Sequence, residues 1–226
     1  MSLLSSLKRL FLRSPKPAPS PVPARSQAKS RVPQVGKPMT MPATQDQLHV
    51  EIPRVATAIA PGMVCDVLSG RSTSLKALPD EIEARVRIDL RGSAELASLP
   101  HGLRTGSLHL ADCTSLESLP SGMEIWFLNL NYCTRLKSLP DDLRLLGGGL
   151  TLRGCTGLSA LPDGLGEVAY LDLSGCTGIT DLPEGLKVTS WMNLTSTGIT
   201  SIPEGYQSAG LRADNGTPLS VEEAIA

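Results

Sequence analysis

The feature that most constrains the fold of this chain is a Leu-Pro or Ile-Pro pair that recurs at nearly constant intervals. The successive prolines are separated by 21, 20, 20, 22, 21 and 20 residues. They are Pro79, Pro100, Pro120, Pro140, Pro162, Pro183 and Pro203. A fixed period of this length is typical of a solenoid, in which each coil buries its apolar face only against neighbouring coils. Residues 66–216 are therefore expected to form one repeat domain.

Each coil also contains a short apolar core of the form L-x-L, which predicts one β-strand per coil. These cores begin at Ile88, Leu108, Leu128, Leu150, Leu171 and Met192, with weaker strands expected at 66–68 and 211–213. Alternation along a strand places the outer residues of each core inside and the middle residue outside. A coil of 20 to 22 residues leaves no room for a full α-helix on the return path, and proline favours extended backbone there. We therefore expect a parallel sheet on one side and extended or 3₁₀ segments on the other.

Four of the five cysteines occupy one repeat position, three residues after the last apolar residue of the strand core. They are Cys113, Cys133, Cys155 and Cys176, and Cys65 lies at the start of the repeats. An odd number of cysteines, placed where the chain turns inward, predicts buried reduced thiols rather than a disulfide framework. We expect a ladder of weak hydrogen-bond donors that line these turns. A metal site is not expected, because the ligands would not converge and no histidine accompanies them.

The side chains that point outward from the strands are the candidate binding residues. They form three columns, and three of the seven aromatic residues of the chain fall in the first column. Aromatic and arginine side chains are common anchors of protein interfaces, so a protein partner is expected on this face, although a merely solvated face fits the same pattern. The predicted contact residues are Arg87, Asp89, Arg91, His109, Phe127, Asn129, Asn131, Arg153, Tyr170, Asp172, Trp191 and Asn193.

The first 44 residues differ in charge from the rest of the chain. Residues 1–44 carry eight Lys or Arg and no acid, whereas residues 45–226 carry 13 basic and 22 acidic residues, a net charge of −9. The Pro- and Ser-rich leader 1–44 is expected to be disordered, and an export leader, a transit peptide and a plain linker remain open for it. Residues 45–65 are expected to cap the first coil, with a short helix beginning at Pro53. Residues 217–226 are expected to form a closing helix with Thr217 as its N-cap.

Several functional classes are disfavoured by composition and motifs. Nucleic acid is not an expected partner for an acidic body. No apolar run reaches the roughly 18 residues that a membrane span requires. The chain has no G-x-S-x-G, H-E-x-x-H, C-x-x-C or G-K-[ST] motif and only three histidines. We therefore expect a monomeric, non-enzymatic protein without a cofactor or metal.

The repeat at residues 171–186 reads L-x-L-x-x-C-T-x-I-x-x-L-P-x-x-L, which is similar to the leucine-rich repeat. With its L-P-x-G-L return paths, short period and basic leader, the chain resembles the leucine-rich-repeat effectors that bacteria inject into host cells by type III secretion. The resemblance covers residues 66–210 and the style of the leader. It implies a curved sheet whose concave face binds a host protein, and delivery into the host cell.

Several of those effectors are E3 ubiquitin ligases, in which a separate C-terminal domain with a Cys-x-Asp motif performs the chemistry. That domain has no counterpart in this sequence, so the resemblance is to the repeat portion only. The repeats are also similar to those of plant intracellular immune receptors, which carry a nucleotide-binding domain. Two alternatives to a host-directed binding module therefore remain: the substrate-recognition part of a ligase, and a structural repeat protein in the cytoplasm of its own cell.

Overall fold

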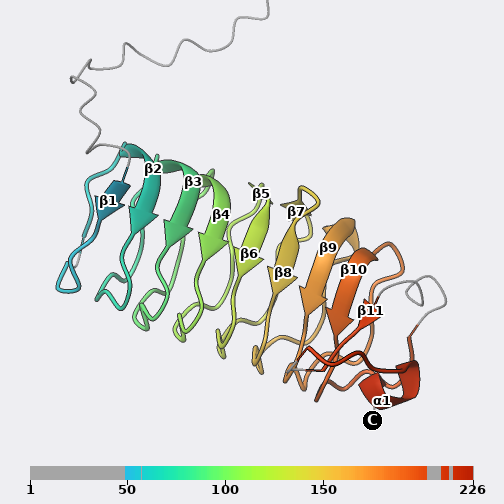
Figure 1. Ribbon diagram of the computed structural model, residues 1–226. Helices are drawn as coiled ribbons and strands as arrows, with labels where there is room; N and C mark the ends of the chain where they lie inside the picture. Colours follow the sequence, from blue (N-terminus) through green and yellow to red (C-terminus); the bar gives the residue numbers. More distant parts are fainter. Residues whose placement is uncertain (1–48, 57, 203–209, 214–215, 226) are drawn as a thin grey trace, which may run out of the picture. The chain divides into compact units, whose positions relative to one another are not determined.

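The computed structural model describes residues 49–56, 58–202, 210–213 and 216–225, and these residues form a parallel β-solenoid (Figure 1). Nine strands make one sheet in the order β1-β2-β3-β4-β6-β8-β9-β10-β11, and a two-stranded sheet is formed by β5 and β7. Every strand pairs with its neighbour in parallel. The predicted repeat solenoid is confirmed. The leader 1–44 lies outside the described residues.

The strands of the main sheet begin earlier than the L-x-L cores suggest. They are β1 (His49–Glu51), β2 (Val64–Ser69), β3 (Glu83–Asp89), β4 (Arg104–His109), β6 (Phe127–Asn129), β8 (Gly149–Thr151), β9 (Glu167–Asp172), β10 (Lys187–Asn193) and β11 (Gly210–Leu211). The chain that leaves each return path is already extended and pairs with the preceding coil, as Lys187 does with Glu167. A register shift between this first part and the core, for example between Ala84 and Arg87, bends the longer strands.

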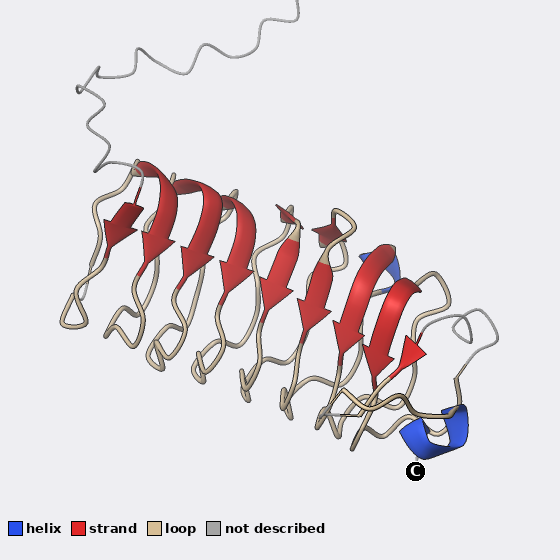
Figure 2. Cartoon of the chain, viewed as in Figure 1, coloured by secondary structure: helices blue, strands red, loops and turns tan. Residues whose placement is uncertain are grey.

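Two coils lack this continuity, and the short strands β5 (Glu124–Ile125) and β7 (Arg144–Leu145) form a separate ladder above them (Figure 2). The 22-residue coil contains the extra glycines 147–149. Gly148 lies so close to the preceding coil that a Cβ there would come within 1.6 Å of the Trp126 carbonyl oxygen. The glycines therefore do more than lengthen this coil, because Gly148 permits the close approach of two backbone segments.

The core is a continuous stack of leucines with the cysteines beside it. The inward residues of the strand cores, such as Leu130 and Leu173, are fully buried, as are Cys113, Cys133, Cys155 and Cys176. Each of these four thiols donates a hydrogen bond to the carbonyl oxygen of the leucine that directly follows the strand of the preceding coil, at 2.9–3.3 Å. The hydroxyl of Ser93 makes the equivalent bond to Gly70. The predicted donor ladder is confirmed, and all five cysteines are free thiols.

The return paths and ends differ from the expectations in detail. Among the described residues, the return paths hold one 3₁₀ turn, η2 (Asp163–Leu165), and are otherwise extended or turn. The cap contributes strand β1, and the helix expected from Pro53 is instead a turn closed by the bond from the Ala56 amide to the Pro53 carbonyl. A proline-initiated turn of this length needs only one such bond.

The closing helix is shorter than expected, and its predicted cap is wrong. Helix α1 (Val221–Ile225) begins after Ser220, whose hydroxyl accepts from the Glu223 amide at 3.3 Å. The Glu223 carboxylate accepts from the Ser220 amide at 2.8 Å. This reciprocal pair is a capping box, which makes Ser220 the N-cap in place of Thr217. No helix in the described part of the chain is long and apolar enough to cross a membrane.

Candidate functional site

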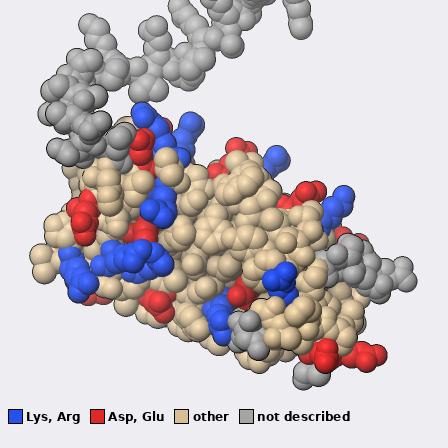
Figure 3. All heavy atoms as spheres, viewed as in Figure 1, with Lys and Arg blue, Asp and Glu red and all other residues tan. Residues whose placement is uncertain are grey.

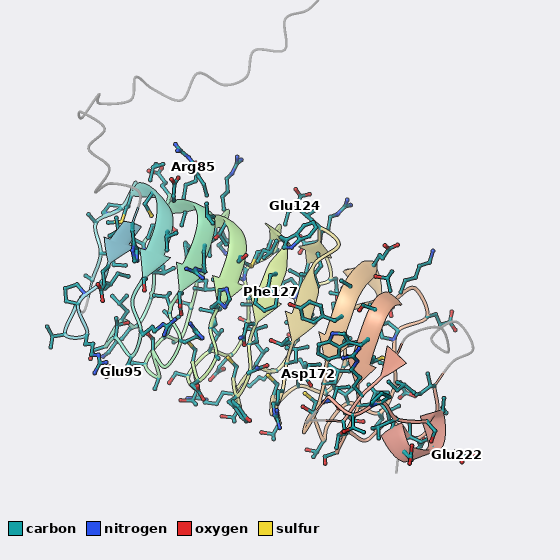
Figure 4. All side chains as sticks on the ribbon, viewed as in Figure 1. Arg85, Glu95, Glu124, Phe127, Asp172 and Glu222 are labelled. Carbon is teal, nitrogen blue, oxygen red and sulfur yellow. The ribbon has the colours of Figure 1, made fainter. Side chains whose placement is uncertain are left out.

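The outward side chains of the main sheet form one surface, which we call the sheet face. Strand register places its first column as Val67, Arg87, Ser107, Phe127, Gly149, Tyr170 and Trp191. The labelled Phe127 lies on this face in Figure 4, whereas Arg85 and Glu124 lie at the end of the solenoid where the strands begin. The residues of the predicted first column are therefore neighbours in space, although each of them comes from a different coil.

The three aromatic rings of this column form a continuous ladder, and the ring of His109, two residues after Ser107, contacts its first member. The ring centroids of His109 and Phe127 are 5.1 Å apart, and those of Phe127 and Tyr170 are 6.0 Å apart. Tyr170 and Trp191 stack at 5.1 Å with an interplanar angle of 11°. The three aromatic side chains are half-buried rather than exposed, because each ring covers part of the next. The result is a rigid apolar platform that still presents ring surface to solvent.

A glycine creates the continuity of this ladder. Gly149 separates Phe127 from Tyr170 in the column, and a Cβ at Gly149 would lie 2.1 Å from Cζ of Tyr170. The Tyr170 ring therefore lies over the backbone of β8 and reaches Phe127 in the strand beyond. Burial raises the pKa of the Tyr170 phenol, which keeps it a neutral hydrogen-bond donor.

A charged cluster lies at the other half of the sheet face. Asp89, whose side chain is 4% exposed, accepts on Oδ2 from Arg71 Nη2 at 2.9 Å and from Arg91 Nη2 at 2.8 Å. Its Oδ1 accepts from Arg91 Nε at 2.9 Å. Burial by itself would raise the pKa of Asp89, but the hydrogen bonds from Arg91 and Arg71 outweigh it and hold the pKa well below its usual range. Both carboxylate oxygens are thus fully used by the two arginines.

His109 joins the charged cluster to the aromatic ladder. Its ring contacts Phe127 on one side and lies within the electrostatic field of Asp89, Arg91 and Arg87 on the other. Burial lowers the pKa of His109, and the nearby arginines lower it further against the attraction of Asp89. The imidazole is therefore mainly neutral at physiological pH and acts as a spacer between the two halves.

Several predicted contact residues hold the local turns. The side-chain oxygens of Asn129, Asp172 and Asn193 each accept from the backbone amide two residues further on, at 3.0–3.1 Å. This is the Asx-turn geometry, and it closes the turn that follows each strand. Asn193 is 3% exposed, so it offers a partner almost no surface. Asn131 and Arg153 lie two residues after Asn129 and Thr151 and are half-buried. Asn131 Oδ1 accepts from the Arg153 amide at 3.0 Å.

Three surface residues of this region escaped the prediction. Arg71 is the equivalent of Arg91 one coil earlier, and extending the columns into the weak first strand would have found it. Trp126 is 57% exposed and directly precedes β6, next to the ladder residue Phe127 in sequence. Tyr132 is 45% exposed in the turn after β6 with a φ of 60°. The alternation of the strand cores does not mark the last two, because Trp126 precedes β6 and Tyr132 occupies the positive-φ position of the turn that follows it.

Within the described residues, no group of three or more His, Cys, Asp or Glu side chains is arranged to hold a metal ion. Burial raises the pKa of Cys133 to about 12, so this thiol is protonated at neutral pH. Comparisons of the chain with protein-family models, curated proteins and solved structures gave no match. The geometry of the sheet face is therefore the feature from which a function is inferred.

Proposed function

We propose that the protein is a leucine-rich-repeat module that binds another protein on its sheet face, which is the concave face of such a module. The observation that carries the proposal is the ladder of Phe127, Tyr170 and Trp191. Large aromatic side chains held rigidly by their neighbours supply contact area at a small cost in conformational entropy. Tyrosine, tryptophan and arginine are also the residues on which binding energy most often concentrates.

The cysteine ladder supports the leucine-rich-repeat assignment. In such repeats the position after the strand is occupied by asparagine or cysteine. Here the side chain at that position donates to the preceding coil in five successive coils, with serine in the first and cysteine in the next four. The carbonyls that the four cysteines reach already accept a backbone amide of their own turn, so the thiol gives each of them a second hydrogen bond that comes from the next coil.

The same proposal makes the protein a non-enzymatic binding module delivered into a host cell. The L-P-x-G-L return paths and the basic leader 1–44 support delivery, through their resemblance to type III secreted effectors. The turn-holding residues Asn129, Asp172 and Asn193 position the face rather than contact the partner. The proposed partner-binding residues are then the rings of the ladder and the arginine cluster, which consists of Arg71, Arg87 and Arg91.

The test is a quantitative pull-down from a lysate of candidate host cells. The bait is the full chain as wild type, as the triple alanine variant of Phe127, Tyr170 and Trp191, and as Trp126→Ala. A protein that is captured by wild type and by Trp126→Ala, and lost with the triple variant, supports binding at the sheet face. The Trp126→Ala variant is the control, because it removes a large exposed ring that directly precedes β6 and lies outside the ladder. Equal capture by all three baits would refute the proposal.

A further inference from the structure

The sheet face is chemically divided, and the division indicates what kind of partner it fits. Three arginines from adjacent coils, Arg71, Arg87 and Arg91, lie in the half formed by β2 and β3. Asp89 is the buried carboxylate among them, and both of its oxygens are already taken by Arg71 and Arg91. The exposed Glu51 of β1 lies in the same row of outward residues, beside Ser69. Arg87 is exposed and makes no ion pair with any described residue. With Glu51 counted, the three arginines exceed the two carboxylates by one positive charge.

This excess runs against the charge of the rest of the protein. Residues 45–226 carry a net charge of −9, yet in Figure 3 the Lys and Arg atoms gather over the half of this face that holds β2 to β4. The neighbouring half, over β6 to β9, is mainly uncharged. A local field of this sign, held in place by a buried carboxylate, attracts anionic groups and repels cationic ones.

We propose, as a refinement of the proposed function, that the partner is an acidic polypeptide segment that crosses the strands of the sheet face. Its carboxylates contact Arg71, Arg87 and Arg91, and an apolar side chain packs on Tyr170 and Trp191. Four strand steps separate β3 from β9, which at about 4.8 Å each gives about 19 Å between the two halves. An extended chain spans that distance in about six residues. The segment is thus defined by composition and by spacing.

Two other occupants fit the face less well. The leader 1–44 has eight Lys or Arg and no acid, so the arginine cluster repels it. A nucleic acid would place phosphates along its whole length, and the acidic body around the cluster opposes a long polyanion. A short acidic segment brings its charge only to the cluster and leaves the rest of the contact to the rings.

The experiment is a selection of binders from a random 16-residue peptide library on the full-length chain. The affinities of the selected peptides are then measured by isothermal titration calorimetry. The expected peptides carry Asp or Glu at one end and a bulky apolar residue about six positions away. Arg87→Glu should weaken them by about tenfold or more, and this loss should shrink at high salt. Lys76→Glu, the same charge reversal at an exposed residue of the return path, should change affinity by less than about twofold.

The outcomes separate this inference from the proposed function. Peptides that depend on Trp191 but lack acids, or that bind Arg87→Glu as well as wild type, would overturn the acidic partner and leave the sheet-face module intact. Peptides that bind Trp191→Ala as tightly as wild type, or a library that yields no binder, would overturn both. Binding of a single-stranded oligonucleotide that is lost with Arg87→Glu and kept with Lys76→Glu would replace the acidic segment by a nucleic acid.

Discussion

The thiol of Cys155 donates a hydrogen bond to the carbonyl oxygen of Leu130 in the preceding coil at 3.0 Å. The same carbonyl accepts from the backbone amide of Cys133 at 3.1 Å. One buried acceptor thus ties its own turn to the next coil, and the relationship repeats along the solenoid. Such bonds couple neighbouring units, which is the interaction on which the stability of a repeat protein depends.

Substitution of Cys155 separates the role of the donor from that of the volume. Cys155→Ser keeps a donor, as Ser93 does naturally, and should cost less than Cys155→Ala. Cys155→Ala removes both the sulfur and the bond and should lower the free energy of unfolding by about 1–3 kcal/mol. Urea unfolding of both variants measures the difference. A serine variant less stable than the alanine variant would show that the bond contributes nothing.

Gly149→Ala should disturb the sheet face without unfolding the protein. The new methyl group would push the Tyr170 ring away from its position over β8, and the contact between Tyr170 and Phe127 would be lost. We expect a reduced near-ultraviolet circular dichroism signal and weaker partner binding. Gly185→Ala is the control, since a Cβ there meets only an ordinary contact at 3.4 Å. Partner binding unaffected by Gly149→Ala would show that the ladder need not be continuous.

The Asp89 cluster should make the protein sensitive to acid in a defined direction. The pKa of Asp89 in the folded protein lies below its unfolded value of about 3.9. Its interactions therefore contribute fully above that pH, and the contribution is lost as pH falls below it. Asp89→Asn should cost about 1.5–3 kcal/mol at pH 7, as expected for hydrogen bonds to a charged group.

Thermal melts of wild type and Asp89→Asn between pH 7 and about pH 2 check this linkage. The difference in melting temperature should be constant near neutral pH and should shrink in the acid range. A difference that stays the same across the whole range would mean that Arg71 and Arg91 do not stabilise the folded protein through this carboxylate.

The leader should direct export if the resemblance to secreted effectors holds. A reporter fused to residues 1–44 should appear in the medium of a bacterium with an active type III secretion system. The same fusion should stay inside a strain whose secretion system is inactive. Retention in both strains would favour a protein that acts inside its own cell.

The sequence predicted the solenoid well because its period records the geometry of a coil. The L-x-L cores and the cysteine position identified buried residues such as Leu130 and Cys155, since both patterns follow from burial. Strand ends were predicted less well, because backbone pairing at Lys187 and Glu167 depends on the neighbouring coil rather than on side-chain type.

The candidate site was predicted only in part. The column of Phe127, Tyr170 and Trp191 followed from alternation, but the role of Gly149 beneath Tyr170 did not. That role depends on the position of the Tyr170 ring, which belongs to a strand two steps away from that of Phe127. An outward position also does not show whether a polar side chain is available to a partner. Asp89 occupies such a position, but its carboxylate is already hydrogen-bonded to Arg71 and Arg91.

Hydroxyl-radical footprinting with the partner recovered in the pull-down shows which side chains of the protein the partner covers. The chain carries its own controls, because Trp126 and Tyr132 are exposed rings of the same residue types outside the ladder. The account predicts that the partner protects Tyr170 and Trp191 from oxidation and leaves Trp126 and Tyr132 as reactive as before. Protection of Trp126 and Tyr132 with Trp191 unchanged would contradict it and place the binding surface away from the ring ladder.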